Sequence, residues 1–473
     1  MRAATLLSVV TLLTSNRAAA QGVSPGASME TAAALPAAGS GLRTMTLAVA
    51  LAYAREHQPA IRAALSRVET RLAQAKVPSA QWFPTVTATA QLFAMTSNNT
   101  TATFVAPDSM DVPRIGGTAV TDTGTFSPYP STFVGAGLLQ ELFDFGRIGA
   151  QRAAADALVT VERHSADAER LDVDLGVEEA FYAVLAAKGI VRAANEAYGR
   201  SLVHRDLAKR GVDSGLRSPV ELTRAEADLT RYDVDRVRAL GGVSVAQSVL
   251  AAAIGAPEMQ LDAAEQPLPR PELPPLADAL ARAQRRDPRL VAAIAQLQGT
   301  EARTRAIGAE LRPDLSLTAT ISGRAGGAPP ANGSVPSGDG WLPAVPNWDA
   351  GLLFIWPLYD GTVAARRDAS ATEEAQRRDD IDIERLRVVA RARETYEQVQ
   401  VARSAVVALQ NSVVAARANW EQADARFRAG IGNAVELADA EAVRTQAEIQ
   451  LALGEFDLER SRAAFGRAIA EGL

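Results

Sequence analysis

The segment Val-Glu-Leu-Thr-Arg-Ala-Glu-Ala at residues 220–227 returns at residues 435–442 as Val-Glu-Leu-Ala-Asp-Ala-Glu-Ala. Six of the eight positions are identical, and each copy begins five residues after a glycine, Gly215 or Gly430. Matches in constant order on either side would make this an internal repeat rather than a coincidence in an Ala/Glu-rich chain. The residues on either side of the octapeptide therefore decide between a repeat and a coincidence.

The flanks do match, with small changes of spacing. In order, the paired segments are residues 51–61 with 280–290, Pro84 with Pro313, and 142–146 with 358–362. We predict two copies of one plan, residues 45–257 and 276–473, joined by a Pro-rich linker at 258–275.

Composition and the N-terminus indicate export. Arg2, the mostly apolar run from Ala3 to Thr14 and the small residues 18–20 predict a signal peptide at 1–20, followed by an extended segment at 21–44. The chain has no cysteine, which excludes disulfides and thiolate metal sites, and its net charge of −6 argues against nucleic acid as a partner. No stretch of about 18 apolar residues follows, so no membrane-spanning helix is expected.

Each copy predicts an Ala-rich first helix, at 46–80 and 275–310, and two long helices after its strands. Between Gly361 and Gly430, 68 residues contain neither Gly nor Pro, long enough for one helix of about 100 Å. Apolar residues within it step by three and four from Val399 to Phe427, the 3.5-residue period of a coiled coil. The helices alone would also fit a coiled-coil rod without a channel.

The strands argue against a simple rod. Residues 84–92 and 314–322 alternate apolar with polar side chains, and hairpins are predicted at 84–142 and 313–359 with loops at 96–128 and 324–346. In residues 347–359, Trp348 and Trp356 share an apolar face and lie about 26 Å apart along a strand. An apolar band between aromatic residues is typical of a lipid-facing barrel strand, although sandwich cores also contain such pairs. Four strands are too few to close a barrel, so neighbouring copies must complete it.

The octapeptides predict two helix starts after glycine reversals. Ser218 to Glu221 reads as a capping box with Pro219 at the first helical position, and Asn433 reads as the N-cap of the second copy. Capping is thus one explanation for Glu221 and Glu436, and a solvated helix face is one for Asp439.

The twofold repeat, the prolines that open each hairpin, the segment Pro-Leu-Tyr-Asp-Gly at 357–361 and the duplicated octapeptide resemble the TolC family of outer-membrane efflux proteins. The resemblance covers essentially the whole mature chain. It departs from the family pattern at Glu141, which occupies the position that Pro357 has in the second copy, so the first strand-to-helix junction is expected to differ.

The resemblance implies a mostly helical protein with a transmembrane β-barrel. A homotrimer would contribute four strands per chain to a twelve-stranded barrel in outer-membrane lipid, and the helices would form an α-barrel tunnel through the periplasm. An inner-membrane pump and a periplasmic adaptor would deliver the substrate. By the same resemblance, Asp439 and Glu436 fall on an acidic ring at the periplasmic constriction, with Glu221 and Arg224 at the equivalent positions of the first copy.

Two other classes remain in view at this stage. An enzyme is disfavoured because His57, His164 and His204 are scattered and no nucleotide-binding, nucleophile or zinc motif occurs, so no catalytic residue, cofactor or metal is expected. A periplasmic adaptor or a structural protein of an envelope complex also has long helical hairpins. Such adaptors usually carry one hairpin, whereas this chain has two complete copies.

Overall fold

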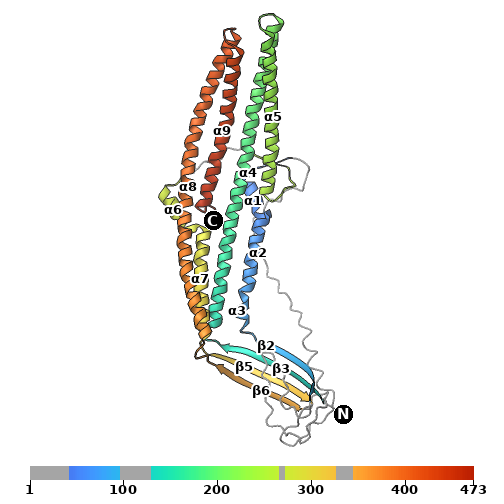
Figure 1. Ribbon diagram of the computed structural model, residues 1–473, viewed down its shortest axis with the longest axis vertical. Helices are drawn as coiled ribbons and strands as arrows, with labels where there is room; N and C mark the ends of the chain where they lie inside the picture. The colour runs from blue at the N-terminus through green and yellow to red at the C-terminus, as the bar shows by residue number, and fades with distance from the viewer. Residues whose placement is uncertain (1–41, 96–128, 266–271, 326–344, 473) are drawn as a thin grey trace, which may run out of the picture. The chain divides into compact units, whose positions relative to one another are not determined.

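The computed structural model describes residues 42–95, 129–265, 272–325 and 345–472 (Figure 1). The predicted signal peptide, most of the segment 21–44, nearly all of both hairpin loops and residues 266–271 of the linker lie outside these ranges. Residues 42–473 form one compact unit by their internal contacts. No helix among the described residues is both long enough and apolar enough to cross a membrane.

The two halves contain matching elements in the same order, except that the short helix α3 has no counterpart in the second half, and this confirms the predicted repeat. In the first half these are β1 (Arg43–Met45), α1 (Leu47–His57), α2 (Pro59–Gln74), α3 (Lys76–Ala80), β2 (Thr85–Met95), β3 (Tyr129–Phe143), α4 (Arg147–Asp213) and α5 (Pro219–Ala253). In the second they are β4 (Leu261–Ala263), α6 (Leu276–Arg286), α7 (Pro288–Ala309), β5 (Asp314–Ala325), β6 (Val345–Ile355), α8 (Gly361–Arg428) and α9 (Ala434–Ala468).

The first helix of each half is broken, contrary to the prediction of one continuous helix at 46–80 and at 275–310. Breaks fall at Gln58 and Asp287, each just before a proline that starts the next helix, and the first half has a further break at Ala75 between α2 and α3. A residue before proline is disfavoured in helical conformation, which explains the breaks at Gln58 and Asp287. Asp287 is buried and caps the new helix through the backbone N–H of Arg289 at 2.9 Å.

The short strands β1 and β4 were not predicted. They show that the end of the segment 21–44 and part of the linker 258–275 belong to the folded structure. They pair in parallel, with Arg43 opposite Leu261 and Met45 opposite Ala263. The strands thus join the end of the predicted segment 21–44 to the predicted linker. Met45, Leu261 and Ala263 are buried in a core with residues of α1, α4 and α5, including Phe181 and Leu250.

The long helices pack as the heptad pattern predicts. Helix α8 has 68 residues, as expected, and α4 has 67. All nine residues of the predicted apolar stripe in α8 are buried or partly buried: Val399, Ala402, Val406, Leu409, Val413, Ala416, Trp420, Ala423 and Phe427. Helix α8 packs against α9, α4 against α5, and α4 also contacts α7 and α9. Helix α4 therefore connects the two halves.

The four long strands form one antiparallel sheet in the order β2-β3-β5-β6 (Figure 1). The sheet leads into the long helices by two different junctions, as the departure at Glu141 predicted. On the first side β3 has a register irregularity between Glu141 and Phe143, and Asp144 accepts from the backbone N–H of Gly146 at 3.0 Å. On the second side Asp360 caps α8 through the N–H of Thr362 at 2.7 Å.

Candidate functional site

The register of the sheet places the predicted apolar faces on one side. Val86 pairs with Leu138, Leu138 with Ala319, and Ala319 with Ala350. The same side carries exposed Leu92, Ile321, Trp348, Leu352 and Phe354. An apolar sheet surface left exposed in a single chain requires a covering phase or partner.

The opposite side of the sheet is polar. Thr87 and Thr89 are partly buried, and Ser316, Thr320 and Ser322 are buried. Asp349 of β6 pairs in register with Thr320 and so lies on this side. This side is polar on β2 and β5, whereas β3 and β6 also place Phe133, Leu139, Leu353 and Ile355 on it. One side of the sheet is therefore apolar and the other carries polar residues on every second position of β2 and β5, as lipid on one side and water on the other would favour.

The predicted position of Trp356 within a strand is wrong. Strand β6 ends at Ile355, whereas the prediction extended it to 359. The ladder stops because the partner strand begins at Asp314, opposite Ile355, directly after Pro313. Trp348 is 76% exposed on the apolar side, while Trp356 is exposed beyond the strand, where alternation no longer assigns a side.

Both octapeptides begin helices after glycine reversals, as predicted, but the caps differ. Gly215 and Gly430 have positive φ angles of 70° and 76°. Asn433 caps α9 by accepting from the N–H of Glu436 at 2.8 Å. The predicted capping box at Ser218 is wrong, because its side chain makes no capping hydrogen bond, and Pro219 alone defines the start of α5.

The glutamates of these first turns form ion pairs. The guanidinium of Arg217 lies 3.0 Å from Glu221, and that of Arg426 lies 3.0 Å from Glu436. Arg217 also donates to the backbone carbonyl of Phe427 at 3.0 Å and lies over its ring at 3.8 Å. Arg217 therefore joins the turn after α4 to the end of α8.

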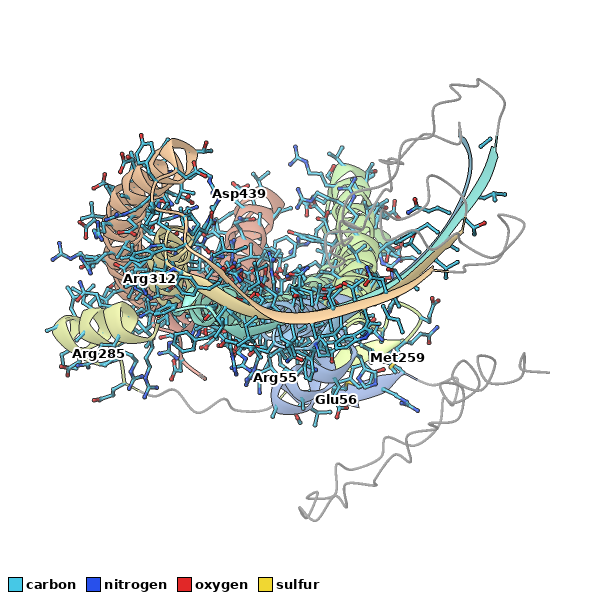
Figure 2. All side chains as sticks on the ribbon, turned by 90° about the horizontal axis from the view of Figure 1, so that it is seen from below. Arg55, Glu56, Met259, Arg285, Arg312 and Asp439 are labelled. Carbon is cyan, nitrogen blue, oxygen red and sulfur yellow. The ribbon has the colours of Figure 1, made fainter. Side chains whose placement is uncertain are left out.

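Three of the four predicted constriction residues line one cavity of about 370 Å³ between α4, α5, α8 and α9. These are Glu221, Arg224 and Asp439; Glu436 does not line it. Asp439, labelled in Figure 2, and Arg224 are both exposed. Within the described residues no ion pair joins these two side chains, so the structure brings them to one cavity without pairing them.

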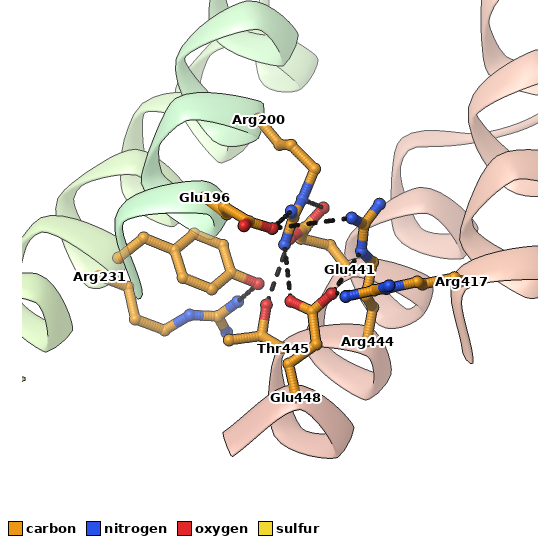
Figure 3. A network of polar contacts seen from close by, with 9 residues as sticks. Glu196, Arg200, Arg231, Arg417, Glu441, Arg444, Thr445 and Glu448 are labelled. Carbon is orange, nitrogen blue, oxygen red and sulfur yellow. Dashed lines mark hydrogen bonds and ion pairs between the residues drawn. The ribbon is translucent and has the colours of Figure 1, made fainter. Parts of the chain in front are cut away.

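A buried ionic network lies beside this cavity and joins α4 to α8 and α9 (Figure 3). Arg200 of α4 donates through Nε to both carboxylate oxygens of Glu441, at 2.9 and 3.0 Å, and approaches Glu448 at 3.7 Å. Glu448 accepts hydrogen bonds from Nε of Arg417 of α8 at 3.0 Å and from Nε of Arg444 at 3.2 Å. The side chains of Glu441 and Glu448 are only 4% and 8% exposed.

The carboxylates of this network favour the charged form of Arg200. Burial acts to lower the pKa of Arg200, but the hydrogen bond and negative charge of Glu441 outweigh it, so the pKa is raised. Arg444 also lies over the ring of Trp420 at 4.7 Å. Removing one member would leave a buried charge unpaired, which is the costly way to break such a cluster.

Sequence reasoning missed Arg200, Arg217 and Glu441. Glu441 was visible, because it is the seventh residue of the octapeptide and Glu226 is its counterpart. No local pattern marks Arg200, whose partners are 241 and 248 residues further along the chain. Arg217 precedes the octapeptide, but its contact with Phe427 depends on tertiary packing.

Comparison with known proteins agrees with this architecture. The family model described as "Outer membrane efflux protein" matches residues 50–256 and 279–471. Among solved structures, the outer-membrane channel OprN matches with a TM-score of 0.68 and 22% identity over 90% of each chain. The Campylobacter jejuni CmeC outer membrane channel matches with a TM-score of 0.71 and 16% identity, over 90% of this chain and 86% of that one.

A third solved structure, the Neisseria gonorrhoeae MtrE outer membrane channel in its open state, has a TM-score of 0.66 and 20% identity over 90% of this chain and 89% of that chain. At these identities the structures show a shared fold. No curated protein matches the sequence.

The chain belongs to the outer membrane efflux protein family, because the family model spans both repeats. It is an exit channel for efflux in the outer membrane. The family is one of channels rather than enzymes, and membership decides against the adaptor alternative that the helices alone left open.

Proposed function

We propose that three copies of this chain assemble into one duct, in which three sheets close a twelve-stranded barrel and the helices continue as a tunnel. The observation that carries the proposal is the sheet, which exposes an apolar side, has the polar residues of β2 and β5 on the other, and has β2 and β6 as open edges. Unpaired edges and exposed apolar surface are both unfavourable, and closure with neighbouring copies removes the edges while lipid covers the apolar side.

Exposed apolar side chains on the helices support the same assembly. They lie on α5 at Val234, Val237, Leu240, Val245 and Val249, and on α8 at Ile383, Leu386, Val401, Val407 and Val414. The α8 positions 386, 407 and 414 are separated by multiples of seven, as expected for a helix packed against another helix. A neighbouring copy is the partner that covers these faces.

Barrel closure can be tested by disulfides between β2 and β6, because the native chain has no cysteine. Ala88 lies on one edge strand and Trp348, Ala350 and Leu352 lie on the other; Trp348 is in register with Ala88, three strand spacings or about 14 Å away within one sheet. That separation prevents a disulfide within one chain. Ala88→Cys combined with Cys at 348, 350 or 352 should give covalently linked trimers for at least one pair, and single-cysteine variants should not. Exclusively monomeric chains throughout the panel, with a monomeric mass in detergent, would contradict the proposal.

The two sides of the sheet can be tested separately. Phe354→Arg places a charge on the apolar side and should impair insertion by about 2–4 kcal/mol if the residue lies near the bilayer midplane. Thr87→Arg places the same charge on the polar side and should be tolerated. Heat-modifiable migration of the assembled trimer measures both, and the opposite pattern would mean that the sides are inverted.

The turns of the two helical hairpins, α4–α5 and α8–α9, then form the periplasmic constriction. Asp439 and Glu436 form an acidic ring there, with Glu221 and Arg224 beside them. Support comes from the shared cavity at the two helix starts and from the ion pairs that hold those starts in place. The duct receives substrate from an inner-membrane pump through a periplasmic adaptor, and photo-crosslinkers placed at exposed Leu216 and Ile431 should capture the adaptor. Capture at exposed Val77 instead, with none at the hairpin ends, would contradict this docking.

A further inference from the structure

A mostly buried histidine between the helical hairpins α4–α5 and α8–α9 has no hydrogen-bond partner. His204 of α4 packs against the rings of Trp420 and Phe427 of α8, each with a centroid separation of 6.3 Å and an edge-on geometry. Its side chain is only 13% exposed and lines the cavity described above. Neither ring nitrogen forms a hydrogen bond, and the indole N–H of Trp420 is also without a partner.

The nearest carboxylate does not form a hydrogen bond with His204. Oδ1 of Asp424 lies 4.0 Å from Nδ1 of His204, which is too far for a hydrogen bond. The other oxygen of Asp424 pairs with Arg428 at 2.8 Å, so its charge is already matched. A protonated imidazole has two N–H donors. Oδ1 of Asp424 is buried and has no hydrogen-bond partner, but it can accept from Nδ1 only if the packing between α4 and α8 shifts, and Nε2 has no partner.

The groups facing His204 come from all four long helices. Arg200 lies on its own helix, Asp424 and Arg428 on α8, and Glu441 and Asp439 on α9, while α5 contributes Glu221, Arg224, Asp228, Arg231 and Tyr232 to the cavity wall. Glu441 is bound to Arg200, Glu221 to Arg217 and Asp228 to Arg231. Glu441, Glu221 and Asp228 are therefore committed to arginines, and a new cation on His204 is compensated only by Oδ1 of Asp424, at 4.0 Å, and by the exposed Asp439.

We propose that His204 is an acid-sensitive release between the hairpins: the neutral ring holds α4 against α8, and its protonation separates them. The inference rests on the proposed role of the hairpin ends as the periplasmic constriction, which would open as the pH falls.

The sign follows from proton linkage. Burial lowers the pKa of His204, and the opposing effect of Asp424 and Glu441 does not restore it. A separated, hydrated His204 has its ordinary affinity for protons and so binds them more tightly than the packed one. Acid therefore favours the separated arrangement, and the packed contact is fully stable only above the ordinary histidine pKa of about 6.5.

Spin labels give a direct measurement in the assembled protein, since the cysteine-free chain allows specific labelling. Cysteines at the exposed positions 214 and 431 mark the turns of the two hairpins. The distance between them in the wild-type background should shift to longer values between pH 7.5 and pH 5. Each unit by which the pKa differs between the packed and separated states contributes a factor of about ten to the ratio of the two populations.

Two variants remove the titration. His204→Phe keeps a ring between Trp420 and Phe427, and His204→Gln keeps a polar side chain without a charge; both should give pH-independent distances. His164→Gln is the matched control, because His164 is on the same helix, lies 3.3 Å from Asp167 and is outside this contact. It should behave as the wild type.

The experiments distinguish failure of the His204 proposal from failure of the proposed channel. A wild-type distance that is independent of pH, that shortens in acid, or that still lengthens in His204→Phe would overturn the release. Conductance of the wild type in planar bilayers tests the duct itself: a protein that forms no pores contradicts the proposed channel, whatever the hairpins do. A conducting wild type should show a several-fold higher open fraction at pH 5 than at pH 7.5, lost in His204→Phe.

Discussion

The two copies of the octapeptide begin the same kind of helix but occupy different surroundings. In the second copy Leu437 is 4% exposed and Glu441 is buried against Arg200. In the first copy Leu222 is only partly buried and Glu226 is exposed. The sequence motif thus specifies the turn and the helix start, whereas the pairing of Arg200 of α4 with α9 rather than α5 makes the second copy part of a buried network.

Two residues that differ between the copies lie where the turns of the two helical hairpins meet. Arg217 corresponds to Gly432, and Arg224 corresponds to Asp439, when the copies are aligned at the octapeptide. Arg217 makes the contact with Phe427, and Gly432 fits against the end of α8, where an added Cβ would approach the backbone of Phe427 within 3.0 Å. Arg217 in one copy and Gly432 in the other therefore both contact the C-terminal end of α8, and together they connect the two helical hairpins.

The largest difference between the copies should appear in Glu441→Gln and Glu226→Gln. The first change leaves Arg200 buried with a weakened partner and should destabilise the contact between α4 and α9 by about 3 to 5 kcal/mol. The second changes an exposed side chain and should have almost no effect. Hydrogen exchange of α9 amides measures both, and equal protection in the two variants would show that the buried network does not hold the hairpins together.

A second test compares buried and exposed glutamates on the two long helices. Burial, together with Asp174 and Glu471, raises the pKa of Glu178 of α4 to about 7. A carboxyl group whose pKa is raised in the folded state destabilises the folded protein as the pH rises from about 4.5 through 7, because its ionisation is disfavoured in the fold. The shift corresponds to at most about 3 kcal/mol above pH 8.

Glu178→Gln should therefore be more thermostable than the wild type at pH 8 and similar to it at pH 5. Glu394→Gln, on the exposed surface of α8, is the control and should follow the wild type at both values. Melting of the helical signal at the two pH values measures the difference. A Glu178→Gln variant that is less stable than the wild type at pH 8 would mean that the carboxylate is needed in its charged form.

Periodicity and repeat matching predicted most of this fold because they depend on local sequence. The 68-residue helix, the buried stripe from Val399 to Phe427 and the two sides of the sheet follow from spacing that a single segment contains. The breaks before Pro59 and Pro288 were also available locally, and the continuous first helices were predicted against that signal. The pairing of β1 with β4 joins residues more than 200 positions apart and has no such signal.

The candidate site was predictable in position but not in its contacts. The octapeptide located both hairpin ends and named Glu221, Glu436 and Asp439. Their partners depend on which side chains α4 and α8 present across the interface, as the link from Arg217 to Phe427 shows. Ser218 and Asn433 illustrate the same limit, since both residue types favour N-caps but only Asn433 forms the hydrogen bond.

That difference in capping gives a smaller prediction. Asn433→Ala removes an observed cap and should cost about 1 kcal/mol of stability at the start of α9. Ser218→Ala removes no capping hydrogen bond and should be nearly neutral, because Pro219 fixes the first turn of α5 without it. Exchange rates of the first-turn amides of α9 and α5 measure the two effects, and equal losses would remove the distinction between the caps.

The smallest expected energy concerns Arg224 and Asp439, the pair by which the copies differ in charge. Both are exposed at one cavity and are not paired in this structure, so any attraction between them should be worth only about 0–1 kcal/mol. A small energy can still have a large effect on conduction, because three Asp439 carboxylates converging at a constriction would attract cations and bind multivalent ones. Asp439→Ala should weaken block by multivalent cations, and Arg224→Ala should strengthen it by removing nearby positive charge. The double variant should lie between them, since the two charges act on the same ion. Single-channel conductance with and without a trivalent cation measures all three. If Asp439→Ala left both conductance and block unchanged, Asp439 would be an ordinary surface charge, and the difference between the copies at this position would have no role in the channel.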